Sequence, residues 1–97
     1  MRTIEELVAE AVRLGADALD VEYKAGHEDV AAMSGQLGVG IARLRSSSPE
    51  AEELRRELYS IVKKRRHVQV GESEYELRAR VRDSFGEDAF RVELRRR

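Results

Sequence analysis

At 97 residues, with 41% hydrophobic and 38% charged side chains, the chain suits a single globular domain (residues 1–97) with a modest core and a highly charged surface. The absence of cysteine excludes disulfides and thiolate chemistry, and no apolar run approaches the length of a membrane span, so we expect a soluble cytoplasmic protein. Residues 1–48 carry 5 basic and 8 acidic side chains, and residues 49–97 carry 13 basic and 11 acidic ones. This basic bias is weaker than that of a dedicated nucleic-acid-binding domain.

The first half predicts one helix and three strands. Thr3 and Glu6 form a capping box for a helix over residues 3–14, and Gly15 suits its left-handed end. Residues 19–25 alternate apolar and polar side chains, as a half-buried strand does. Two further strands are expected at residues 29–33 and 37–44, separated by a short turn.

The second half opens with the clearest helix of the chain, over residues 48–66. Ser48 can cap it, Pro49 suits its first position, and acidic residues crowd its first turn while basic residues crowd its last. Strands are expected at residues 67–70, 74–82 and 89–95, and the last two alternate cleanly. The shared apolar faces predict a core that includes Val8, Leu54, Leu58, Tyr75, Leu77, Phe90 and Val92.

The resulting order, α-β-β-β-α-β-β-β, predicts an α+β fold. Short turns favour antiparallel hairpins, and alternating strands favour a sheet covered on one face, so both helices should pack on one side of about six short strands. An offset of 50 residues relates the apolar stripes of the two helices, which raises the hypothesis of an internal duplication.

No constellation of residues predicts catalysis, a metal or a cofactor. His27, Glu28 and Asp29 are adjacent, so strand geometry would point them to opposite faces. The glycines at 35, 38 and 40 lead into a strand, whereas a phosphate-binding loop leads into a helix N-terminus. We therefore expect a protein that is not an enzyme.

One local likeness involves the first half. Gly15-Ala16-Asp17, the strand at 19–25 and the Gly38-Val39-Gly40-Ile41 strand together resemble the N-terminal α/β region of TldD/PmbA-type peptidases. The zinc-binding helix motif of that family is absent, so the resemblance implies no activity.

The expected function is a small interaction or regulatory module, which binds a protein partner or associates with itself through the open sheet face. If Gly40, Ala42 and Leu44 face the helices, then Val39 and Ile41 lie on the open face with Met33 as a partner-binding patch. In the alternative, Val39 and Ile41 belong to the core and the glycines face solvent. The alternative is a nucleic-acid-associated protein, which would use basic residues of the second half: Lys63, Lys64, Arg65, Arg66, Arg78 and Arg80.

Overall fold

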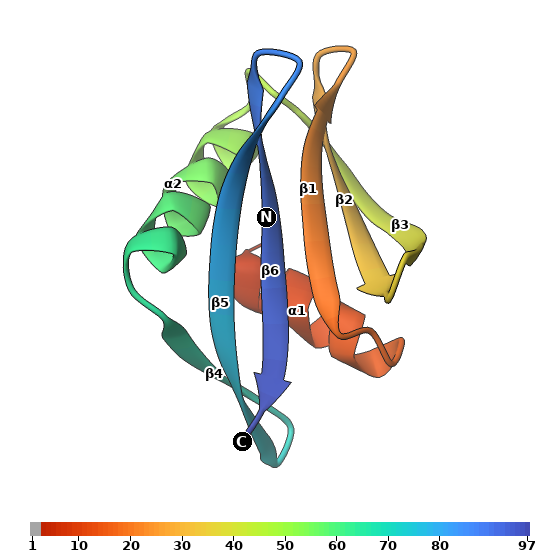
Figure 1. Ribbon diagram of the computed structural model, residues 1–97, viewed down its shortest axis with the longest axis vertical. Coiled ribbons are helices and arrows are strands. Elements are labelled where there is room, and N and C mark those ends of the chain that lie inside the picture. Colours follow the sequence, from red (N-terminus) through yellow and green to blue (C-terminus); the bar gives the residue numbers. More distant parts are fainter. Residues whose placement is uncertain (1–2) are drawn as a thin grey trace.

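The computed structural model describes residues 3–97. Its elements follow the predicted order: α1 (Ile4–Arg13), β1 (Ala18–Lys24), β2 (His27–Ser34), β3 (Leu37–Arg45), α2 (Pro49–Lys63), β4 (Arg66–Val70), β5 (Ser73–Ser84) and β6 (Glu87–Arg96). The strands form one antiparallel sheet in the order β3-β2-β1-β6-β5-β4. Both helices lie behind the same face of this sheet in Figure 1, which confirms the two-layer α+β fold. Neither of these helices is long and apolar enough to cross a membrane.

The helix ends follow the signals in the sequence, with one difference. Thr3 and Glu6 form the capping box of α1, and the Ser48 hydroxyl accepts a hydrogen bond from the Ala51 N–H at the start of α2. However, α2 ends at Lys63, three residues before the predicted end. Arg66 consequently belongs to β4, where strand alternation decides its direction.

The core lies between the helices and the sheet. Six of the seven predicted core residues are buried, and Tyr75 is partly buried against them. Leu58 of α2 is completely buried. One charged side chain is also buried: Glu28 accepts hydrogen bonds from the Ser46 hydroxyl (2.8 Å) and from Arg55 Nη1 (3.3 Å), which links β2 to α2.

The two halves of the chain meet at the centre of the sheet, where β1 pairs with β6 (Figure 1). On the open face Arg91 donates a hydrogen bond to Asp20 across this seam (3.2 Å). Arg82 of β5 reaches Glu22 of β1 (3.6 Å), so this ion pair spans the intervening β6. The offset of 50 residues relates edge strand β3 to central strand β6, so it matches strands in different sheet environments.

The predicted faces of β3 are wrong in part, because a β-bulge interrupts its pairing with β2. Val30 pairs with Ala42 but Ala31 pairs with Gly40, so Ile41 is the inserted residue. Ala42 packs on the core as predicted, and Ile41 does so as well. Beyond the bulge the alternation is reversed: Val39 pairs with buried Ala32 on the helix side, and Gly40 lies on the open face.

Candidate functional site

The predicted patch of Met33, Val39 and Ile41 is not brought together on one face. Met33 pairs with Gly38 on the open face, and its sulfur fills the space where a Cβ of Gly38 would lie. Val39 and Ile41 are on the helix side, where Val39 is 58% exposed beyond the edge of the core. Of the three patch residues only Met33 lies on the open sheet face, so this face carries no apolar patch of the predicted kind. The candidate site lies elsewhere.

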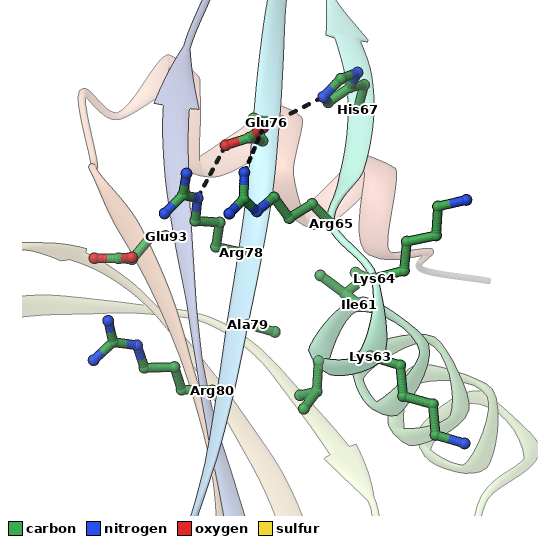
Figure 2. Close-up of a pocket in the computed structure, with 11 residues that line it drawn as sticks. Ile61, Lys63, Lys64, Arg65, His67, Glu76, Arg78, Ala79, Arg80 and Glu93 are labelled. Atoms are coloured by element: carbon green, nitrogen blue, oxygen red, sulfur yellow. Dashed lines mark hydrogen bonds and ion pairs between the residues drawn. The ribbon is translucent and has the colours of Figure 1, made fainter.

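A basic groove lies between the C-terminal end of α2 and the edge of β5 (Figure 2). Ala79 points from β5 toward the helix end and Ile61, whereas Arg78 and Arg80 extend from the opposite side of the strand. Five cations and two carboxylates line this groove. They are Lys63, Lys64, Arg65, Arg78, Arg80, Glu76 and Glu93, with His67, Ile61, Val62 and Ala79 as the remaining lining residues.

Five of the six predicted nucleic-acid-binding residues thus line one groove, although Arg78 and Arg80 lie on the other side of β5 from Lys63 and Lys64 (Figure 2). The exception is Arg66, which does not line the groove and donates a hydrogen bond from Nη2 to Glu57 of α2 (2.7 Å). Its neighbour His67 faces the groove, as strand alternation requires. The basic run at 63–66 is therefore divided between two sides of the sheet.

Glu76 is the centre of the charge network. Arg78 Nε donates a hydrogen bond to its carboxylate (3.0 Å), and Arg65 Nη1 and His67 Nε2 lie 3.8 Å and 3.5 Å from Oε2 (Figure 2). The hydrogen bond from Arg78, with help from His67 and Arg65, lowers the pKa of Glu76 below its ordinary value. Glu76 therefore remains ionised at neutral pH and neutralises part of the positive charge of Arg65 and Arg78.

Three cations of the groove are left for a ligand. Within the described chain, the side chains of Lys63, Lys64 and Arg80 form no hydrogen bond or ion pair. The two lysines extend from the helix end into solvent in Figure 2. Arg80 lies opposite Arg91, which is itself engaged with Asp20. With five cations against two carboxylates, the groove carries a net positive charge.

The groove also adjoins an open strand edge. β4 pairs with β5 only as far as Leu77, whereas β6 pairs with β5 up to Ser84. The stretch of β5 from Arg78 to Ser84 consequently has a strand on one side only. The unequal lengths of the predicted strands 67–70 and 74–82 are the signal in the sequence for this edge.

The other candidate residues are engaged structurally. His27 bonds to the carbonyl of Ala25, Glu28 is buried at the start of β2, and Asp29 lies 3.3 Å from Arg43. Residues 3–97 contain no group of three or more His, Cys, Asp or Glu side chains able to hold a metal ion. No protein family model matches the chain, and a search of curated proteins finds no relative.

Proposed function

We propose that this protein is a non-catalytic binding module that recognises a negatively charged protein partner at the basic groove. The observation that carries the proposal is that three cations lining one groove, Lys63, Lys64 and Arg80, form no hydrogen bond or ion pair within the described chain. Rim charges of this kind speed association and select partners by complementarity. The proposal replaces the open sheet face by the groove, because Met33, Val39 and Ile41 do not share a face.

A protein partner suits the groove better than a nucleic acid, although its lysines could contact phosphates. Binding of single strands usually adds large aromatic side chains on which bases stack, and the groove lining has no Phe, Tyr or Trp. The nearest exposed aromatic on α2, Tyr59, donates its hydroxyl hydrogen bond to Asp88 and packs edge-on against Phe90.

Fluorescence anisotropy with a labelled oligoglutamate peptide and a labelled oligothymidylate tests the proposal. The peptide should bind at low salt, and the double change Lys63→Glu with Lys64→Glu should weaken binding by at least about tenfold. The matched control is Arg13→Glu with Lys24→Glu, which makes the same charge change at residues that do not line the groove.

Two results would contradict the proposal. Equal weakening by both double variants would show that only the net charge matters. Tighter binding of the oligothymidylate, with an affinity that falls steeply with salt, would favour the nucleic-acid alternative.

A further inference from the structure

We infer that the groove binds its partner by strand addition, in which an extended segment with alternating acidic and apolar residues pairs with the free edge of β5. This inference rests on the proposed function and specifies its ligand. Four features support it: the direction of the backbone groups, the charges on one side of the edge, the apolar residues on the other, and the poor fit of a second copy of this chain.

The backbone groups along the free edge can be assigned from the two flanking turns. The two-residue turn Phe85-Gly86 makes Ser84 and Glu87 a hydrogen-bonded pair, so every second residue back along β5 bonds to β6. The turn Gly71-Glu72 likewise makes Ser73 and Val70 a hydrogen-bonded pair, so Ser73 and, by the same alternation, Leu77 form their backbone hydrogen bonds with β4. The two turns therefore give the same assignment: the even-numbered residues of β5 bond to β6, and the odd-numbered residues bond on the opposite side.

The odd-numbered residues of β5 point their backbone N–H and C=O groups away from β6. In the unpaired stretch these residues are Ala79, Val81 and Asp83, and none of their backbone groups bonds to another part of the described chain. They offer three donors and three acceptors to an incoming strand, which is the geometry of β-augmentation. Water hydrates these groups in the free protein.

Charge determines which side chains the incoming strand should carry toward the open face. Arg80 and Arg82 alternate with the outward-bonding residues, so they would occupy the non-hydrogen-bonded positions of the new ladder. Side chains at such positions approach most closely across two strands. An acidic residue opposite Arg80 would therefore form a direct cross-strand ion pair, and one opposite Arg82 would compete with Glu22, which lies 3.6 Å from Arg82.

Apolar side chains are favoured at the alternate positions. Ala79 and Val81 share the helix-side face of β5 with buried Leu77, and Val81 is 39% exposed. Val62 of α2 lines the groove with Ala79 and is 36% exposed. An apolar residue of the incoming strand would cover these side chains, while its acidic neighbours face the arginines.

A second copy of this chain is a poor occupant of the same edge. A two-fold antiparallel pairing of β5 with itself about Val81 places Arg80 opposite Arg82 twice. Shifting the centre to Arg80 or to Arg82 places that arginine opposite its own copy. Like charges directly opposite one another destabilise a ladder, so the arginines disfavour self-pairing and favour an acidic strand.

The test is a nuclear magnetic resonance titration of the ¹⁵N-labelled protein with the capped peptide Glu-Val-Glu-Val-Glu-Val-Glu. The amides of Ala79, Val81 and Asp83 should shift and become protected from hydrogen exchange. Gly38 and Gly40, on the outer strand β3, should not respond. A response at the two glycines instead would overturn the inference, because the peptide would then have chosen the other edge.

Variants at Val81 separate strand addition from simple charge attraction. Val81→Pro removes an outward N–H without removing a bond to β6, and it should weaken peptide binding about tenfold, as expected for one lost hydrogen bond. Val81→Thr keeps the N–H and the β-branched shape and should bind like the wild type. The proton–nitrogen spectrum of the free Val81→Pro protein verifies its fold.

A charge exchange tests the same edge without altering its backbone. Arg80→Glu should lose affinity for the acidic peptide about tenfold and should gain affinity for the Lys-Val counterpart. If Arg80→Glu and Val81→Pro both bind the acidic peptide normally, strand addition is wrong. Binding of oligoglutamate that still depends on Lys63 and Lys64 would leave the proposed function standing, and loss of both interactions would end both proposals.

Discussion

Replacing Leu58 by alanine should lower the free energy of unfolding by about 2–5 kcal/mol. Leu58 is completely buried within the core cluster, so the full transfer term applies. Three carbon atoms are removed, at about 0.8 kcal/mol for each buried methylene, which gives roughly 2.4 kcal/mol before any cavity term. Incomplete collapse of the helix onto the sheet adds the remainder.

Urea unfolding followed by far-ultraviolet circular dichroism measures this loss as a lower midpoint with an unchanged slope. The melting temperature should fall by roughly 8–40 °C, since a domain of this size loses about 4–8 °C per kcal/mol. Val62→Ala, four residues further along the same helix and 36% exposed, is the matched control and should change stability by less than about 1 kcal/mol. A loss below about 0.5 kcal/mol for Leu58→Ala would refute the packing of α2 described above.

Three further predictions concern the surface. Changing Lys64 and Arg65 to Gln should alter the unfolding free energy by less than about 1 kcal/mol, because Lys64 is unpaired and Arg65 is an exposed side chain whose contact with Glu76 is long (3.8 Å). A larger loss by urea unfolding would show a structural role. Because Arg78 and His67 lower the pKa of Glu76, its carboxylate stabilises the fold above pH 4.5, and this contribution disappears as pH falls through the lowered value. Glu76→Gln should therefore lower the melting temperature at about pH 6, with a difference from wild type that narrows toward about pH 3; a constant difference would contradict the assignment. Phe85→Asn should raise the unfolding free energy by about 0.5–2 kcal/mol, because Phe85 is fully exposed at φ 53° in a turn that prefers Asn-Gly; no gain in the urea midpoint would argue against strain at this turn.

Local signals made the order of elements predictable. Capping residues such as Thr3 and Ser48, and the strict alternation of strands such as β5, act over a few neighbouring residues and need no knowledge of the fold. The bulge at Ile41 is different, because an extra residue is defined only against a partner strand. Without that partner, the faces of Val39 and Gly40 were assigned the wrong way round.

The candidate site was predictable in composition but not in arrangement. The basic residues were visible, and alternation alone could have separated Arg66 from His67 once the helix end was known. The free edge of β5 depends on which strand lies beside it and on where that strand stops. The β4–β5 hairpin is local, so the unequal lengths of its two strands already indicate where β4 stops. Only the order of the whole sheet, which a single sequence does not display, shows that no other strand of the described chain pairs with this edge.

The seam between β1 and β6 also has a consequence for the order of folding. Four of the five strand pairings join strands linked by a two-residue turn, whereas the seam joins residues 18–21 to residues 90–93. We expect the local hairpins to form early and the seam late, because closing so long a loop costs more conformational entropy. On the ribosome, β1 has no partner on its inner side until the last strand has been synthesised. The centre of the finished sheet is therefore the edge that stays uncovered longest in a nascent chain.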